Sequence, residues 1–165
     1  MEDHSVQTLL SDDEEQDPIP ALLRWARGAY GQAVRGNLAE AGFDDLPGNG
    51  PFVLGGMARF NGSAADMITG LGVTKQAASQ LIDTLVLRGY LTREVDPEDR
   101  RRMTISLTER GRGAAQATRT AVDSIDAELA TMITPAELAG LRAGLTALAE
   151  ITARSAHPRA HHHDE

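Results

Sequence analysis

Residues 72–91 have the sequence GVTKQAASQLIDTLVLRGYL, and this pattern predicts a single amphipathic helix. Thr74 is of a type that caps helix starts and Gly89 of a type that ends helices, so we expect the helix to span residues 74–88. Apolar residues at three- and four-residue spacing form one stripe: Ala78, Leu81, Ile82 and Leu85. The opposite side is polar. A helix of this kind packs on one side and faces solvent on the other.

A shorter helix is predicted just before it. Ser63 starts this helix, and Asp66, three residues on, completes a variant of the capping box. Its apolar members are Met67 and Ile68, and the glycines in residues 70–72 end it. Two helices joined by a tight, glycine-containing turn are typical of a helix-turn-helix.

A β-hairpin is predicted directly after the helix-turn-helix. Residues 103–107, MTISL, alternate apolar and polar side chains, which is the clearest strand pattern in the chain, and residues 90–95 form the partner strand. The loop between them, residues 96–102, reads DPEDRRR and gives the hairpin a basic tip. A helix-turn-helix followed by such a hairpin is a winged helix. The expected fold is therefore mainly α with a small β-hairpin wing.

The N-terminal side of the winged helix is also predicted to be helical. Pro18 and Pro20 predict an extended segment over residues 17–20, because a residue before proline avoids the helical region. A helix is then expected over residues 21–41. After a loop rich in glycine and proline, a short apolar helix is expected over residues 52–60.

The C-terminal side is predicted to hold two further helices. Thr108 is placed to cap a long one. Thr134, Pro135 and Glu137 form a second start signal, with a cap, a proline at the first helical position and a glutamate at the third. Leucines recur every three or four residues after that start.

The apolar stripes of residues 21–41 and 108–153 exceed what one small winged helix can cover. We therefore expect a two-fold homodimer in which these helices pair between subunits, the alternative being a monomer with a helical lid. The predicted organisation has five segments: an acidic disordered tail (1–17), an N-terminal dimerisation helix and loop (18–50), the winged helix-turn-helix (51–107), C-terminal dimerisation helices (108–154) and a mobile tail (155–165).

The charge of the chain is unevenly distributed. The net charge is −8, yet residues 1–20 hold seven acidic groups and no Lys or Arg, whereas residues 59–119 hold ten basic groups against seven acidic ones. Because salt screens exposed charges beyond about 8–10 Å, local charge governs contact with phosphate more than the total does. The acidic total therefore does not exclude nucleic acid as a partner.

The polar face of helix 74–88 is suited to the major groove of duplex DNA. Its side chains are those of Thr74, Lys75, Gln76, Ser79 and Gln80. Gln pairs with adenine and Lys with the acceptors of guanine, and hydroxyls bind bases or phosphates. The alternative is an ordinary solvated helix face.

The tip of the hairpin is suited to the minor groove or to phosphates. Arg100, Arg101 and Arg102 lie there, and a narrow minor groove concentrates negative potential. Asp99 beside them can orient one guanidinium through a charge-assisted hydrogen bond. The alternative is a charged turn that aids solubility.

Residues 52–113 resemble the MarR family of bacterial regulators. The resemblance rests on residues 72–85, on Arg88 to Leu91 (RGYL), on the wing at 96–102 and on residues 107–111, LTERG. It implies a homodimer whose terminal helices form the interface and whose winged lobes bind half-sites of a pseudo-palindromic operator, usually to repress transcription. By the same resemblance, Asp99 positions Arg101 for the minor groove.

The resemblance also implies a small effector, often aromatic or anionic, that binds between the helical and winged parts and releases DNA. Family members that sense oxidants use cysteine, and this chain has none, which leaves ligand sensing or no sensing. The candidates for effector contacts are the bulkiest apolar residues on the two helices at that junction: Trp25, Tyr30, Phe52 and Met57. The alternative is that these four belong to the core.

Other classes of function have little support in the sequence. All five histidines lie at positions 4, 157 and 161–163, near the ends of the chain, and the glycines do not fit phosphate-binding motifs. We therefore expect no enzyme, cofactor or metal site. With no long apolar run and no secretion signal, we expect a cytoplasmic protein without a membrane partner. The main alternative is a winged-helix adaptor or anti-activator that binds another protein rather than DNA.

Overall fold

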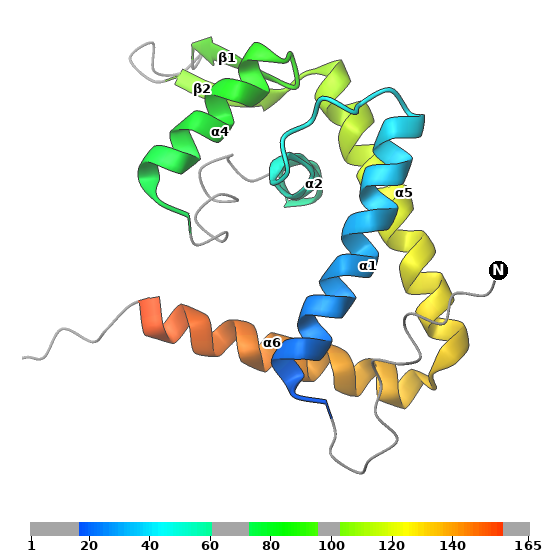
Figure 1. Ribbon diagram of the computed structural model, residues 1–165. Helices are drawn as coiled ribbons and strands as arrows, with labels where there is room; N and C mark the ends of the chain where they lie inside the picture. The colour runs from blue at the N-terminus through cyan, green and yellow to red at the C-terminus, as the bar shows by residue number, and fades with distance from the viewer. Residues whose placement is uncertain (1–16, 61–72, 96–102, 157–165) are drawn as a thin grey trace, which may run out of the picture. The chain divides into compact units, whose positions relative to one another are not determined.

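The computed structural model describes residues 17–60, 73–95 and 103–156. In chain order the elements are α1 (Ile19–Glu40), α2 (Gly50–Phe60), α4 (Lys75–Leu87), β1 (Leu91–Val95), β2 (Met103–Leu107), α5 (Glu109–Met132) and α6 (Pro135–Ala156), as labelled in Figure 1. The prediction of a mainly helical fold with a β-hairpin wing is confirmed. The helix predicted from Ser63 and the loop at 96–102 lie outside the described residues.

The chain forms two compact units, and the division falls within α5. The first unit ends at Ile125 and the second begins at Asp126. The first therefore holds α1, α2, α4, the hairpin and most of α5, and the second holds the end of α5 and α6. In the first unit, α2 lies between α4 on one side and α1 and α5 on the other (Figure 1).

The first unit has a largely aliphatic core. Its fully buried large side chains are those of Val53, Leu54, Leu85, Tyr90 and Leu91. Leu38, Met57, Ala114 and Ala115 complete the buried cluster, so α1, α2, α4, β1 and α5 all contribute to it. This composition follows from the sequence, in which only 4% of residues are aromatic. Removal of these side chains from water supplies the main force that holds the five elements together.

α1 begins earlier than the proline pattern predicts. An extended segment was expected over residues 17–20, whereas the helix starts at Ile19 with Pro20 in its first turn. The backbone N–H groups of Ala21 and Leu22 donate to the carbonyl of Pro18 at 2.8 and 3.3 Å. Proline is tolerated at the start of a helix because its missing N–H would have no intrahelical partner there.

α6 begins with the capping box that the sequence predicts. The N–H of Glu137 donates to Oγ1 of Thr134 (3.3 Å), and Oε2 of Glu137 accepts from the N–H (2.8 Å) and the hydroxyl (2.7 Å) of Thr134. The hydroxyl and then the backbone N–H of Thr134 lower the pKa of the Glu137 carboxyl. These bonds satisfy donors that a helix start otherwise leaves unpaired.

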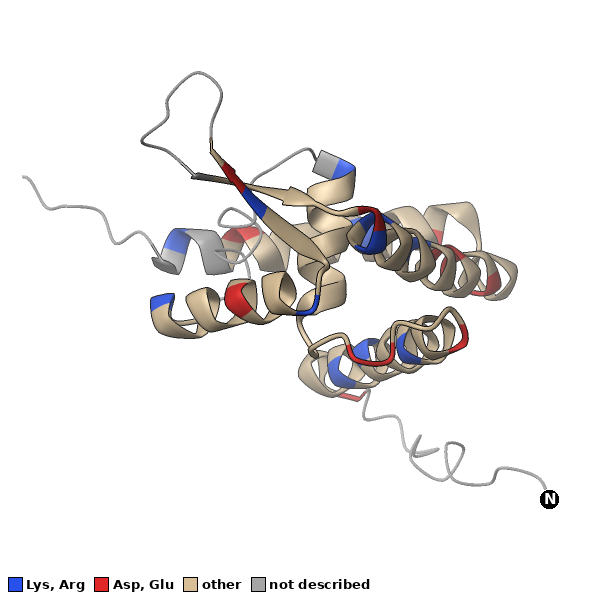
Figure 2. Ribbon diagram, turned by 90° about the horizontal axis from the view of Figure 1, so that it is seen from above, with Lys and Arg blue, Asp and Glu red and all other residues tan. Residues whose placement is uncertain are grey.

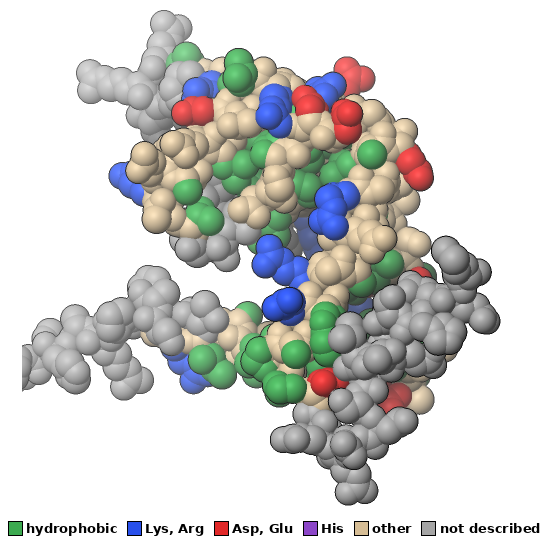
Figure 3. Space-filling model, viewed as in Figure 1, with side chains coloured by type: hydrophobic (Ala, Val, Ile, Leu, Met, Phe, Trp, Pro, Cys, Tyr) green, Lys and Arg blue, Asp and Glu red, His purple; other side chains and the backbone are tan. Residues whose placement is uncertain are grey.

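α6 carries a row of exposed apolar side chains. Its members lie at three- and four-residue spacing and are between 39% and 54% exposed: Leu141, Leu145, Leu148 and Ile151. Figure 3 shows hydrophobic side chains at the surface in the region where α6 and the start of α1 overlap in this view. An exposed row of this kind often marks a contact with another surface, so the row is a candidate contact surface. No helix in the described part of the chain has both the length and the apolar character of a membrane span.

Candidate nucleic-acid interface

The first half of α4 presents the polar side chains that the sequence predicts. Thr74 caps the helix, since its Oγ1 accepts a 3.2 Å hydrogen bond from the N–H of Ala77. The side chains predicted to face DNA are all exposed: Thr74, Lys75, Gln76, Ser79 and Gln80. On the other side of the helix Leu85 is buried and Leu81 and Ile82 are partly buried against the core. The helix is thus held through its apolar side and leaves its polar residues accessible.

The end of α4 is fixed by a glycine turn. Gly89 has a φ of +73°, a backbone conformation that residues with a side chain rarely adopt and that glycine adopts freely. The N–H of Tyr90 donates to the carbonyl of Leu85 (2.9 Å) and the N–H of Gly89 to that of Val86 (3.0 Å). This is the Schellman pattern, which ends the helix and directs the chain into β1.

The hairpin that follows is antiparallel, with Leu91 opposite Leu107 and Val95 opposite Met103. An ion pair between Arg93 on β1 and Asp83 on α4 links the strand to the helix. Lys75 begins α4 and Arg88 follows its last residue, with Asp83 between them, so the charges along the helix alternate in sign (Figure 2).

The predicted tip of the wing is not placed by this structure. Asp99, Arg100, Arg101 and Arg102 lie outside the described residues. Their contact with a groove or with phosphates therefore stays a prediction from the sequence.

A polar cluster that the sequence analysis missed lies where α4 ends and α5 begins. Oδ1 of Asp45, in the loop after α1, accepts from the Tyr90 hydroxyl and from Nη2 of Arg110, the latter at 2.8 Å. Nη2 of Arg110 also donates to the Tyr90 hydroxyl oxygen (3.1 Å). We name Asp45, Tyr90 and Arg110 the Asp45 cluster. No periodic pattern links these three positions in the sequence, and Asp45 reads only as a loop residue.

Electrostatics within the Asp45 cluster favour its charged groups. The hydrogen bond from the Tyr90 hydroxyl, and then the Arg110 guanidinium, lower the pKa of Asp45. Burial and the bond to Asp45 raise the pKa of Tyr90, and hydrogen bonds to Tyr90 and Asp45 raise that of Arg110. The cluster therefore stays an ion pair with a neutral tyrosine at physiological pH.

A cavity of about 890 Å³ opens between α2 and the part of α5 in the first unit. Its wall includes apolar groups such as Phe52 and Val122, together with three arginines, Arg59, Arg112 and Arg119. The described lining contains no acidic residue. A mixed wall of this kind suits a small molecule with an apolar body and a negative charge.

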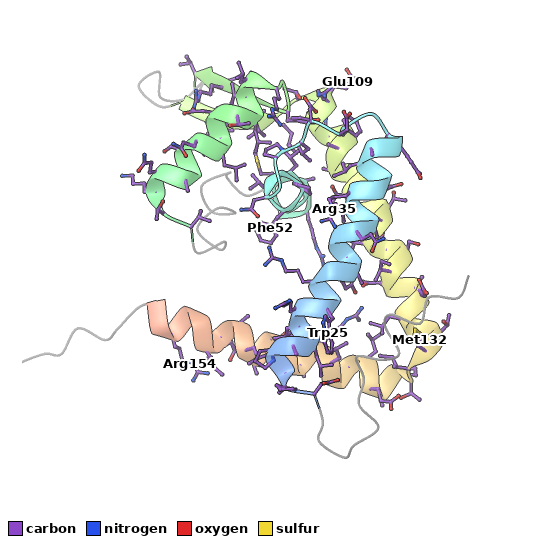
Figure 4. All side chains as sticks on the ribbon, viewed as in Figure 1. Trp25, Arg35, Phe52, Glu109, Met132 and Arg154 are labelled. Carbon is purple, nitrogen blue, oxygen red and sulfur yellow. The ribbon has the colours of Figure 1, made fainter. Side chains whose placement is uncertain are left out.

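The four predicted effector residues do not meet at this cavity. Phe52 lines it, whereas Met57 is buried in the core cluster. Trp25 and Tyr30 are not among the lining residues, and Figure 4 shows Trp25 near the start of α1, away from Phe52 on α2. Their spacing in the sequence gave no means of telling the wall of a cavity from the core.

Residues 46–102 match the sequence model of the MarR family. The predicted resemblance to the MarR family is confirmed. The matched segment contains α2, α4, β1 and the sequence of the wing loop. The comparison with curated proteins found no match.

Solved structures of MarR and of MepR share the fold of this chain. The S. aureus MepR–DNA complex has a TM-score of 0.67 at 20% identity, and the match covers 84% of this chain and 99% of that chain. The apo form of wild-type MarR from E. coli has a TM-score of 0.57 at 21% identity, with coverage of 81% and 98%. S. aureus MepR bound to ethidium bromide has a TM-score of 0.53 at 22% identity, with coverage of 82% and 96%. The likeness extends over nearly the full length of each of these proteins.

Proposed function

We propose that this protein is a transcriptional regulator that binds duplex DNA in a sequence-specific manner. The observation that carries the proposal is the capped helix α4, with five exposed polar side chains in a segment that matches the MarR family. An α-helix fits the major groove, where each base pair presents a distinct pattern of donors and acceptors. Similarity in fold to MepR, which has been solved in complex with DNA, supports the same function.

The active form in this proposal is a homodimer that binds a pseudo-palindromic operator. Two half-sites place two copies of α4 in successive turns of the major groove. The exposed apolar row on α6 supplies a surface for the pairing. At the start of α1, the apolar side chains of Ile19, Leu22 and Leu23 are also exposed and supply a second surface.

We further propose that the protein represses transcription and that an anionic aromatic effector in the cavity between α2 and α5 releases it from DNA. Phe52 offers a ring surface there, and Arg59 and Arg112 bring positive charge to the wall, whereas the charge of Arg119 is paired with Asp123. MepR has been solved with ethidium bromide bound, which shows that a protein of this fold accommodates a flat aromatic molecule. The arginines of this chain favour the opposite charge.

The test of DNA binding starts with selection of bound duplexes from a random-sequence library, followed by fluorescence-anisotropy titrations at two salt concentrations. We expect one enriched motif with two-fold symmetry and tight binding that resists competition by unrelated duplex. Affinity should fall steeply with salt, because phosphate contacts release counterions. Recovery of unenriched sequences, all bound equally weakly, would contradict the proposal.

The test of the effector adds benzoate, or benzamidine as the cationic comparison of similar size, to the complex with the selected duplex. Benzoate should lower the anisotropy at concentrations where benzamidine does not. Replacement Phe52→Ala should weaken the response to benzoate and leave DNA affinity intact. If benzoate releases the Phe52→Ala variant from DNA as readily as the original protein, the effector binds outside this cavity.

The alternative function is an adaptor or anti-activator that binds another protein. The net charge of −8 favours it over a nucleic-acid binder. The same titration separates the two, since an adaptor has no symmetric motif and a largely apolar protein interface responds little to salt.

A further inference from the structure

The Asp45 cluster joins the far end of α4 to the start of α5 through directional contacts. Besides the bonds within the cluster, Arg88, which caps the C-terminus of α4, donates from its guanidinium to the backbone carbonyl of Asp45. Thr108, just before α5, donates from its hydroxyl to the carbonyl of Gly89 (2.6 Å) and from its N–H to the carbonyl of Tyr90 (3.1 Å). The loop after α1, the end of α4 and the start of α5 are thus held together at one place, which we call the joint.

The Arg110 guanidinium has a defined orientation within this joint. Its central carbon lies 4.6 Å from the centroid of the Tyr90 ring and 5.7 Å from that of the Phe43 ring. The two rings are 6.2 Å apart and inclined at 59°. The two rings hold the guanidinium by cation–π contact, and the hydrogen bonds from its Nη2 to Asp45 and Tyr90 restrict its rotation. Apolar contacts such as those of Leu85 have no such directionality.

Because the joint lies at the C-terminal end of α4, a small rotation there produces a large displacement at the N-terminal end of the helix. α4 has 13 residues, so its start lies about 20 Å from the joint at its end. A rotation of about 10° there would displace Thr74 and Gln76 by about 3 Å, which is more than a hydrogen bond to a base edge tolerates. Contacts from long basic side chains to phosphates tolerate such a shift better, because these side chains are flexible and phosphates lie all along the backbone.

We propose that the Asp45 cluster sets the angle of α4 against α5 and thereby determines how well this protein discriminates its operator from other DNA. The proposal rests on the proposed function. Asp45, Tyr90 and Arg110 are positioning residues, since they act through α4 and none is among the side chains assigned to DNA. Loosening of the cluster should therefore reduce specific binding and spare non-specific binding.

The experiment compares two neighbouring substitutions, Asp45→Ala and Asp44→Ala. Both remove one negative charge from the same exposed loop, but the Asp44 carboxylate has no hydrogen bond or ion pair within the described residues. Each variant is titrated against the duplex selected by the unaltered protein and against a scrambled duplex, at two salt concentrations. We expect Asp45→Ala to lower the ratio of the two affinities about tenfold, with scrambled-duplex affinity and salt dependence unchanged, and Asp44→Ala to leave the ratio unchanged.

A second variant, Tyr90→Phe, keeps the test informative if Asp45→Ala fails to fold. It keeps the buried ring and removes only the hydroxyl that bonds Asp45 and Arg110. We expect the same selective loss of operator affinity, with melting still cooperative. An unchanged ratio in both Asp45→Ala and Tyr90→Phe, or an equal fall on both duplexes, would overturn the positioning role. If the unaltered protein itself shows no preference between the duplexes, the proposed function fails, and the positioning role falls with it.

Discussion

The side-chain amide of Asn37 on α1 donates a 2.6 Å hydrogen bond to the backbone carbonyl of Ala117 on α5. The bond connects residues 80 positions apart and is partly buried. It therefore ties α1 to α5 within the first unit.

Replacement of Asn37 by Asp should destabilise the fold. Asn37→Asp keeps the shape of the side chain but sets a carboxylate against the Ala117 carbonyl, which should lower the free energy of unfolding by about 2 kcal/mol. Gln32→Glu makes the same chemical change at an exposed position of α1 and should be nearly neutral. Urea denaturation followed by circular dichroism measures both. Equal effects of the two variants would mean that the Asn37 bond contributes nothing specific.

A methyl group at Gly111 should be strongly destabilising. A Cβ there would lie 2.1 Å from the carbonyl oxygen of Tyr90, a backbone atom that cannot move aside cheaply. We expect Gly111→Ala to cost about 3 kcal/mol of folding stability. At Gly36 on α1 a Cβ meets nothing within 4 Å, so Gly36→Ala should stabilise the protein by about 0.5–1 kcal/mol. The melting temperatures of the two variants should shift in opposite directions. A Gly111→Ala protein as stable as the original would refute the close approach of Gly111 to the Tyr90 carbonyl.

The capping box of α6 should make stability depend on pH. Bonds from Thr134 hold the pKa of Glu137 below its ordinary value, so the folded carboxyl releases its proton more readily than the unfolded one. This contribution is complete above the unfolded pKa and is lost as the pH falls through the folded pKa. Glu137→Gln should therefore lower the free energy of unfolding at neutral pH. On acidification, the stability of this variant should fall less than that of the original protein. Glu150→Gln, on the same helix, serves as control, and parallel acid curves for Glu137→Gln and the original would argue against the effect.

The apolar row on α6 should hold two subunits together. Leu145→Glu places a charge in the middle of the row and should shift the protein from dimer to monomer in sedimentation equilibrium. Ala143→Glu adds the same charge about 160° around the helix from Leu145, on the side away from the row, and should leave the dimer intact. A dimer of unchanged strength in Leu145→Glu would exclude this row from the interface.

Local signals in the sequence predicted most of the fold. Thr74, Thr108 and Thr134 each cap the helix that their spacing predicts, because capping depends on residues within one turn. The start of α1 was predicted wrongly because proline disfavours a helix before it but is accepted within the first turn.

The candidate site could be predicted only in part, because only some of its residues are arranged by local signals. Exposure of the polar side chains at 74–76, 79 and 80 follows from the period of one helix. The Asp45 cluster instead joins positions 45, 90 and 110, and the cavity joins α2 to α5, so both depend on tertiary contacts that no local pattern encodes.

If the exposed face of α4 reads the sequence of bases, a second selection from the random library, made with an altered helix, should recover a different motif. The double variant Gln76→Ala and Gln80→Ala removes two amide side chains that can pair with base edges and leaves Lys75 in place. We predict that the variant recovers a relaxed motif, with at least one position in each half-site no longer enriched, and that it binds scrambled duplex as before. Recovery of the original motif at the original affinity would contradict the claim.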